Sequence, residues 1–446
     1  MLTRSGYVVT NCSPEVKKEL NVRPLVNNEF GFPPPAFKVY KTGKNSICVP
    51  RFYGIEKFGE PSEDKRPTPE KLSSCIKFNG KLRDETSQNE ALTKGVEAGH
   101  GVLSLPCGYG KTTVALAMAV KLGLRTMIIV HKEFLANQWR ERIQQFCPGA
   151  TIGVVQQDKI ETDCDFVIAM LQSLSTKEYN YEVFEKIGTL FVDEAHHICA
   201  RVFSQALFKL CPRHCYGLSA TPDRKDGLTK VLHWFLGPTF FSVQRENQKQ
   251  VEVFIVDYTC KQFNDPPPCN KLGKVSLVTM ITDLVENPDR NSMIERLLKR
   301  LLKTSRKVLV LSDRREHCKL LQKKFEDVSG LYMGGMKEHA LAESSTKKII
   351  FGTFSQAHEG LDIPTLDTVI LTTPKSDIQQ SIGRVMRETP GKQNSPWIFD
   401  IFDHWSLLGA MFQKRRKVYK QGGFKIDFEE EKKEPEKELF KGKCLL

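Results

Sequence analysis

The feature that most constrains the fold is a glycine loop lying between a strand-like run and a helix-like run. The apolar run Val102–Leu105 is followed by Gly108-Tyr109-Gly110-Lys111-Thr112, and the next residues, TVALAMAVKL, have helical character. Glycines in such a turn let backbone N–H groups close on phosphate oxygens, and the N-terminus of the following helix adds positive potential. The order strand, loop, helix therefore predicts a phosphate-binding loop.

The residues of this loop have separate expected roles in nucleotide binding. Lys111 is expected to reach the β- and γ-phosphates, and Thr112 to ligate Mg²⁺. The strict pattern has glycine where Leu105 stands, so the loop is irregular at its first position. A purely structural glycine turn is the competing interpretation, which the strand-to-helix context disfavours. With ATP and Mg²⁺ as the cofactors, the predicted loop contacts are Gly108, Tyr109, Gly110, Lys111, Thr112 and Thr113.

A pair of carboxylates follows another apolar run further along the chain. Leu190-Phe191-Val192 leads directly into Asp193-Glu194-Ala195-His196. Hydrolysis at a phosphate site requires such a pair: Asp193 would hold Mg²⁺ through its water shell, and Glu194 would orient and deprotonate the attacking water. Acidic pairs are also common on solvated turns, but few follow a strand downstream of a Gly-Lys-Thr loop. His197 is predicted to be structural or solvent-facing.

The composition and the hydrophobic periodicity of the sequence divide the chain into five segments. Residues 1–80 are rich in proline and glycine and form an N-terminal extension, which either contacts nucleic acid or packs on the first domain. Residues 81–240 and 291–410 alternate apolar strands with amphipathic helices, which predicts two tandem α/β domains with parallel sheets. Residues 241–290 connect them and contain a strand of their own. Residues 411–446 are a charged tail, expected to be helical or disordered.

The charge balance points to a negatively charged partner. Lysine and arginine total 66 against 53 aspartate and glutamate, giving a net charge of +13 at pH 7. Nucleic acid is the leading candidate for such a partner, and solubility alone is the competing explanation. Charge by itself does not separate the two.

The cysteines and the hydropathy pattern indicate the kind of cellular compartment in which the chain works. The 13 cysteines are scattered without CxxC pairs, and no apolar signal segment precedes them, so we expect an intracellular protein with reduced thiols. Cys211, His214 and Cys215 lie close together in sequence, but no second ligand pair stands at a spacing that zinc would use. No apolar run reaches the ~18 residues of a membrane span, so no membrane partner is expected.

With both halves of the nucleotide site in place, the sequence resembles the superfamily 2 DEAH-box helicases over most of residues 82–387. The lead Leu105-Pro106-Cys107-Gly108 is similar to the XPB branch and, within it, to helicases of large DNA viruses, including the poxvirus transcript-release type. This resemblance implies two RecA-like domains with ATP in the cleft between them. It also implies an ATP-driven motor that acts on nucleic acid.

Further motifs of the first domain follow from the same resemblance. Ser219-Ala220-Thr221 is similar to the third motif, which couples hydrolysis to nucleic-acid binding. Arg224 and Asp226 match the Arg-Glu-Asp tripeptide of XPB proteins and Lys225 does not, so translocation with and without strand separation both stay open. His131-Lys132 and Leu171-Gln172-Ser173 resemble backbone-contacting motifs. The implied nucleic-acid or coupling residues are His196, Ser219, Thr221, Arg224 and Thr353.

The second domain is expected to complete the nucleotide site. Gly360-Leu361-Asp362-Ile363-Pro364 resembles motif V and places Asp362 at the nucleotide. Residues 380–387 resemble motif VI, in which Arg384 and Arg387, three apart on a helix, share one face. The resemblance makes Arg387 the finger on the γ-phosphate and Arg384 a second phosphate contact. Gln88, in the first domain, stands where the family's glutamine contacts adenine.

Several alternatives stay open from the sequence. Duplex DNA is the preferred track, with RNA or a DNA–RNA hybrid as the alternative, and an ATP-regulated binding protein without unwinding is a rival class. A nuclease is disfavoured because residues 1–80 hold no acidic metal cluster. The basic run Lys414–Lys417 is a nuclear-localisation patch, a nucleic-acid contact or a solvated helix face. Transcription or replication machinery is a candidate partner, and the nucleus or a viral replication site a candidate location.

Overall fold

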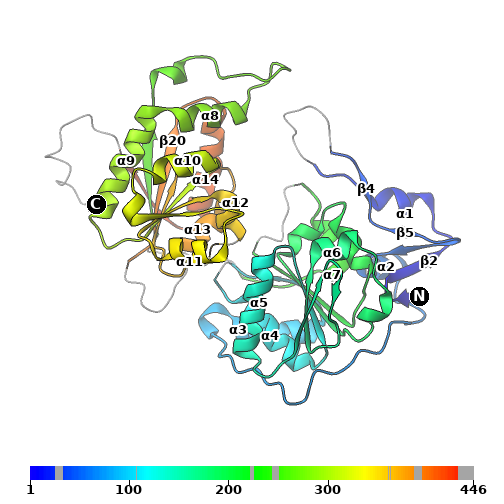
Figure 1. Ribbon diagram of the computed structural model, residues 1–446. Coiled ribbons are helices and arrows are strands. Elements are labelled where there is room, and N and C mark those ends of the chain that lie inside the picture. The colour runs from blue at the N-terminus through cyan, green and yellow to red at the C-terminus, as the bar shows by residue number, and fades with distance from the viewer. Residues whose placement is uncertain are drawn as a thin grey trace. The chain divides into compact units, whose positions relative to one another are not determined.

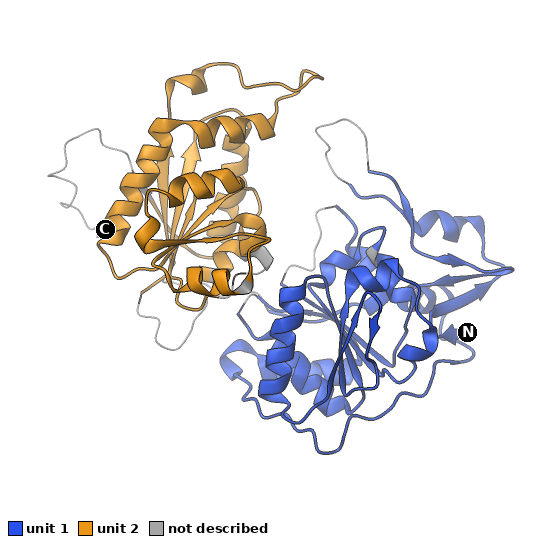
Figure 2. Cartoon of the chain, in the orientation of Figure 1, with its two compact units in different colours: residues 1–244 blue, residues 245–446 orange. Residues whose placement is uncertain are grey.

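The computed structural model divides into two compact units, residues 1–244 and 245–446 (Figure 2). Within them the structure describes the following residues: 1–25, 34–106, 108–220, 226–243, 251–359, 361, 363–385 and 394–429. Among these residues, no helix combines the length and the apolarity that crossing a membrane requires. The described residues also hold no group of three His, Cys, Asp or Glu side chains arranged to bind a metal ion.

The first unit is built on an eight-stranded sheet with the strand order β10-β9-β11-β8-β12-β13-β7-β14. Every neighbouring pair is parallel except β10 with β9. The strands are β7 (His100–Ser104), β8 (Thr126–Val130), β9 (Ile152–Gln156), β10 (Lys159–Ile160), β11 (Phe166–Met170), β12 (Thr189–Asp193), β13 (His214–Ser219) and β14 (Thr239–Ser242). Its central strands are nearly continuous apolar runs because helices and turns cover both faces of the sheet.

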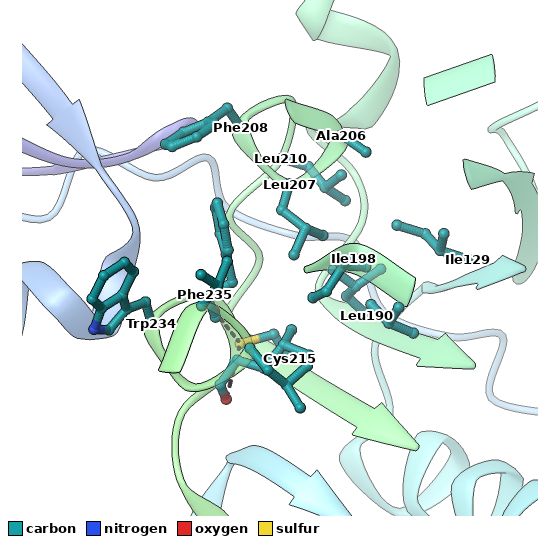
Figure 3. Packing of buried hydrophobic residues seen from close by; sticks show 14 of the residues in the cluster. Ile129, Leu190, Ile198, Ala206, Leu207, Phe208, Leu210, Cys215, Trp234 and Phe235 are labelled. Atoms are coloured by element: carbon teal, nitrogen blue, oxygen red, sulfur yellow. Dashed lines mark hydrogen bonds between the residues drawn. The ribbon is translucent and has the colours of Figure 1, made fainter. Parts of the chain in front are cut away.

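Successive strand residues point to opposite faces, and each face has its own helical layer. On one face Leu103, Ile128 and Phe191 join a core with α3 (Gln88–Ala98), α4 (Lys111–Leu122) and α5 (Glu133–Phe146), seen in Figure 1. On the other, Ile129 and Leu190 join the core that contains α6 (Leu171–Thr176) and α7 (Thr229–Leu236). Figure 3 shows this second core, in which the turns η3 (Ala195–Ile198) and η4 (Phe203–Phe208) also pack.

The described part of the N-terminal extension is folded and shares the core of the first unit. It forms a small antiparallel sheet of order β1-β2-β6-β5 and a β3-β4 hairpin. The Tyr53 ring packs edge-on against Trp234 of α7, with ring centroids 5.1 Å apart. The described helices and strands of this extension end at Phe58, and residues 59–83 form no regular helix or strand. Its elements are β1 (Leu2–Thr3), β2 (Gly6–Thr10), α1 (Pro14–Glu19), β3 (Asn21–Val22), β4 (Phe37–Lys38), β5 (Lys41–Thr42), β6 (Ser46–Val49) and α2 (Arg51–Phe58).

The second unit is built on a seven-stranded sheet of order β17-β18-β16-β19-β20-β15-β21, with every described pair parallel. The segments predicted as connection (241–290) and charged tail (411–446) each contribute a strand to it. Pairing between strands so far apart in sequence leaves no periodic signal, so neither could be assigned to the sheet. The strands are β15 (Glu252–Tyr258), β16 (Val308–Ser312), β17 (Ser329–Tyr332), β18 (Ile349–Thr353), β19 (Thr368–Leu371), β20 (Trp397–Asp403) and β21 (Lys425–Glu429).

Helices cover both faces of the second sheet as well. One core joins β15, β16 and β18 to residues of α12, α13 and α14, and the other joins the same strands to α9 and α10. The helices are α8 (Leu277–Glu286), α9 (Pro288–Leu302), α10 (Arg315–Gln322), α11 (Glu338–Thr346), α12 (Phe354–Glu359), α13 (Gln379–Val385) and α14 (Leu407–Gln421).

The basic run Lys414–Lys417 lies within α14 and is not a uniform solvated face. Arg415 is only 2% exposed and donates through Nε to both carboxylate oxygens of Asp400, at 3.0 and 2.8 Å. Tyr419 donates its hydroxyl to the same carboxylate at 2.8 Å. Arg415 is therefore a structural residue of the second unit rather than a surface contact.

A buried histidine makes the second unit sensitive to acid. His317 bridges Ser312 Oγ and Asn291 Oδ1, each at 3.0 Å, and burial together with the Arg290 charge lowers the pKa of His317 to about 3. In the unfolded chain His317 takes up a proton near pH 6.5, whereas in the folded protein it stays neutral down to about pH 3. The contribution of neutral His317 to the free energy of unfolding is therefore complete above pH 6.5 and is lost as the pH falls toward 3.

We expect His317→Gln to weaken the pH dependence of the free energy of unfolding. The wild type should lose up to about 1.4 kcal/mol per pH unit from this group between pH 6.5 and 4, and the variant should not. Denaturant unfolding of both proteins at several pH values measures the two slopes. Equal slopes would mean that His317 does not carry the effect.

Candidate active site

The predicted functional residues of the first unit meet at the carboxyl edge of its sheet. The neighbouring parallel strands β8, β12, β13 and β7 end at Val130, Asp193, Ser219 and Ser104. In open α/β sheets ligands bind at this edge, because the loops after the parallel strands converge there. The structure thus brings together segments that lie far apart in the sequence.

The glycine loop has the backbone geometry that anion binding requires. Gly108 and Gly110 have φ angles of +88° and +79°, which side chains of L-residues rarely tolerate. The Leu105 N–H donates to the carbonyl of Ser219 at 3.2 Å, which ties the start of the loop to the end of β13. α4 begins at Lys111, and the N–H groups of a first helical turn have no partner within the helix. These donors face the loop, as phosphate binding needs.

Three polar side chains hold the loop in shape. Lys111 Nζ donates to the carbonyl of Leu105 at 3.1 Å. Gln88 is only 1% exposed; its amide oxygen accepts from the Arg83 N–H at 3.0 Å, and its amide nitrogen donates to the Tyr109 carbonyl at 2.9 Å. The Arg83 guanidinium donates to the carbonyl of Gly108 at 3.1 Å. The nitrogen of the Gln88 amide therefore holds the loop directly, and its oxygen holds the backbone of Arg83, whose side chain also contacts the loop.

This arrangement leads to a specific expectation for Gln88→Ala. Losing two hydrogen bonds should loosen the loop and weaken the binding of ATP and of GTP by a similar factor, roughly tenfold. Fluorescence titration with the two labelled nucleotides measures both affinities. The exposed Gln145 on α5 provides a control, because Gln145→Ala leaves the loop untouched. A loss confined to ATP would instead support the predicted contact with adenine.

Asp193 ends β12 with both carboxylate oxygens engaged. Oδ1 accepts from the Glu194 N–H at 3.0 Å, and Oδ2 accepts from the indole N–H of Trp139 at 2.9 Å. Burial and the Glu194 charge raise the pKa of Asp193 to about 6, while the Trp139 hydrogen bond and the Lys111 charge oppose this shift. Lys111 and Asp193 thus act on one another electrostatically, as residues around one nucleotide would. Trp139 was missed by sequence reasoning, since an aromatic residue on an amphipathic helix resembles ordinary core.

Glu194 combines a strained backbone with a buried carboxylate oxygen that accepts no described hydrogen bond. Its φ angle is +45°, and its side chain is 16% exposed. Among the described residues its Oε2 atom is buried without a hydrogen-bond partner, and His196 Nδ1 lies 3.6 Å away. Backbone strain of this kind costs about 1–3 kcal/mol, and such residues cluster at functional sites. A buried carboxylate oxygen with acceptor capacity to spare suits a residue that must bind a water molecule.

The histidines after Glu194 connect three segments of this edge. His196 Nδ1 lies 3.4 Å from Ser219 Oγ, so the acidic turn touches the segment that resembles the third motif. The His197 ring lies 4.4 Å from the His196 ring and 4.0 Å from that of His131, which follows β8. Burial, with His197 and Lys132 nearby, lowers the pKa of His131 to about 3, so this ring is neutral. His197 is packed between two rings, which agrees with its predicted structural role.

In the second unit the segments resembling motifs V and VI pack together. Leu361 and Ile363 share one core with Ile382 and Val385 of α13. Thr353 ends β18, and its Oγ1 accepts from the Gln356 N–H at 3.4 Å, which caps α12. Among the predicted residues, Asp362, Arg387, Thr221 and Arg224 lie outside the described residues, as does the side chain of Arg384 on α13.

Two parts of the chain match known protein families. Residues 80–224 match the family described as Type III restriction enzyme, res subunit, and residues 289–389 match the family described as Helicase conserved C-terminal domain. The first match contains the glycine loop, the acidic pair and Ser219. The second contains Thr353 and α13.

Two viral proteins are similar over most of the chain. A candidate ATP-dependent RNA helicase of Acanthamoeba polyphaga mimivirus, L396, is 34% identical over 429 residues, which cover 90% of this chain and 81% of that protein. A candidate helicase of Invertebrate iridescent virus 6, 161L, is 30% identical over 375 residues, which cover 78% of this chain and 82% of that protein. The similarity therefore extends well beyond the short motifs.

A solved structure shares the fold. S. cerevisiae Dbp5, bound to RNA and ADP BeF3, aligns with a TM-score of 0.52 over 79% of this chain and 96% of its own, at 13% sequence identity. At this identity the likeness concerns the fold alone. That fold is a pair of RecA-like α/β domains with parallel sheets, as the sequence predicted.

Proposed function

Since this chain belongs to the superfamily 2 helicases, ATP-hydrolysing enzymes that act on nucleic acid, we propose that it is a nucleic-acid-stimulated ATPase that moves along duplex DNA. The observation that carries the ATPase part is the grouping of the glycine loop, Asp193 and Glu194 at one sheet edge. The net charge of +13 supports a nucleic-acid track.

In the proposed mechanism the loop and the N-terminus of α4 bind the phosphates of ATP. Lys111 exchanges its hydrogen bond to the Leu105 carbonyl for one to a β- or γ-phosphate oxygen. Thr112 and Asp193 would hold Mg²⁺, which when bound offsets negative charge on the phosphate oxygens. The fit of these residues to Mg²⁺ is supported by their position, because Thr112 lies in the first turn of α4 directly after the loop and Asp193 ends β12 at the same edge of the sheet.

Glu194 is the proposed general base. Its Oε2, which has no hydrogen-bond partner among the described residues, accepts a hydrogen bond from a water molecule and takes a proton as that water attacks the γ-phosphorus. The new bond joins the water oxygen to the γ-phosphorus, and the bond from the γ-phosphorus to the bridging oxygen breaks. ADP and phosphate are the products.

The second domain completes this site in the proposed cycle. Asp362, Arg384 and Arg387 contact the nucleotide only when the two domains close on it, with Arg387 on the γ-phosphate. Hydrolysis removes that contact and lets the domains open. His196, Ser219, Thr221, Arg224 and Thr353 link this change to the nucleic-acid backbone, which is gripped without reading its sequence.

The choice of duplex DNA as the track depends on the resemblance to one branch of the family. The Leu105-Pro106-Cys107-Gly108 lead and the Arg224 and Asp226 pair are similar to the XPB branch of the DEAH-box helicases, which favours duplex DNA. The RNA alternative is favoured by the description of the mimivirus relative as an RNA helicase.

A panel of substrates separates these two functions. Tailed duplex DNA and a tailed DNA–RNA hybrid, together with single-stranded DNA and RNA, are incubated with the protein and ATP. Strand displacement is measured on the tailed duplexes, and ATP turnover on all four. The proposal predicts the largest stimulation of turnover by duplex DNA. Stimulation by RNA alone would replace it with the RNA function, and the direction of displacement on tailed substrates gives the polarity.

A further inference from the structure

The indole of Trp139 touches the acidic pair from a different element of the fold. Trp139 lies on α5, is 2% exposed, and donates its N–H to Asp193 Oδ2 at 2.9 Å. The second oxygen, Oδ1, is held by the Glu194 N–H at 3.0 Å. Two donors from separate segments therefore fix the rotation of one carboxylate. We propose that Trp139 is a positioning residue whose indole N–H holds the Asp193 carboxylate in the orientation that binds Mg²⁺.

The hydrogen bond is more than the by-product of burying a large apolar side chain. An indole N–H can only donate. Elsewhere in the described chain, the buried Nε1 atoms of Trp397 and Trp405 have no hydrogen-bond partner. This fold thus buries indoles without acceptors, yet it directs that of Trp139 to a carboxylate oxygen. A hydrogen bond to an ionised acceptor is also shorter and stronger than one between neutral groups.

The packing of Trp139 gives that bond a fixed direction. The ring lies in the core that α5 shares with α4 and the central strands, among Leu135, Ile143 and Ile128. A ring enclosed in this way cannot swing aside, so the donor stays where the carboxylate needs it. The remaining lone pairs of Asp193 can then accept from the water shell of Mg²⁺. This role rests on the proposed function, because it assumes that Asp193 binds the ion.

The test removes the donor in two ways, one of which keeps the two-ring shape of the indole. Trp139 is replaced by 3-benzothienylalanine, which has sulfur in place of the N–H, and separately by phenylalanine. The affinity for mant-ATP is measured in EDTA and over a Mg²⁺ titration. We expect both variants to keep the wild-type affinity in EDTA. They should need about tenfold more Mg²⁺ to reach the half-maximal gain in affinity.

Trp405→Phe is the matched control, since it removes a buried indole N–H that has no hydrogen-bond partner among the described residues, and its Mg²⁺ dependence should equal that of the wild type. Wild-type Mg²⁺ dependence in the benzothienylalanine protein would overturn the proposal. Equal losses of affinity with and without Mg²⁺ would also overturn it and leave Trp139 as core packing. Failure of nucleic acid to stimulate ATP turnover would refute the proposed motor and leave these binding measurements unaffected.

Discussion

Glu194→Gln is expected to lower the rate of ATP hydrolysis by about 100-fold or more while leaving the affinity for ATP nearly unchanged. Glutamine has the size of glutamate but cannot accept the proton of the attacking water. The buried Oε2 has no hydrogen-bond partner among the described residues, so the variant gives up no hydrogen bond of that atom. Thermal stability should therefore stay equal or rise. Single-turnover hydrolysis, mant-ATP binding and a thermal melt measure the three quantities.

The control for this variant is Glu141→Gln, which changes an exposed glutamate on α5 and should leave hydrolysis unaffected. If Glu194→Gln hydrolysed ATP within a few-fold of the wild-type rate, another residue would have to be the base. A parallel loss of affinity and rate would point to damage to the site as a whole. Only the predicted separation of rate from affinity supports the general-base role.

Asp403→Ala is expected to destabilise the second unit by about 3–5 kcal/mol. Asp403 receives two hydrogen bonds from Arg290, from Nε at 2.7 Å and from an Nη atom at 2.9 Å, and both side chains are 0% exposed. Removing the carboxylate leaves a buried guanidinium without its counter-charge. Denaturant unfolding, followed with a probe in the second unit, measures the loss.

A double variant separates the lost pair from the orphaned charge. Arg290→Met with Asp403→Leu removes both charges and should recover most of the stability that Asp403→Ala loses. Glu316→Ala is the control, because its ion pair with Lys319 is exposed and should contribute little to stability. If Asp403→Ala were no worse than the control, the pair would not anchor the second unit.

The parts of the site that could be predicted from the sequence are those at the ends of parallel strands, because these ends always meet at one edge of the sheet. Lys111, Asp193 and Ser219 each follow an apolar run, and parallel strands deliver the ends of such runs to one edge. The alternation of strands and helices likewise predicted both α/β domains. These features depend on local pattern, so a single sequence is enough to find them.

Other features depend on contacts that have no local pattern. Trp139 reaches Asp193 from another element, and Gln88 donates to the backbone of the loop at Tyr109. The addition of β15 and β21 to the second sheet joins segments that are widely separated in the chain. In each case tertiary packing chooses the partner, and neither residue type nor periodicity reveals it.

We propose that nucleic acid stimulates ATP hydrolysis by this chain. The most direct measurement is steady-state ATP turnover by the wild-type protein over increasing concentrations of duplex DNA, single-stranded DNA and RNA, with Glu194→Gln as the background. Turnover should rise several-fold and saturate with at least one of these nucleic acids, most with duplex DNA, and the effect should weaken as salt is added. Turnover that is the same with and without every nucleic acid would contradict this proposal.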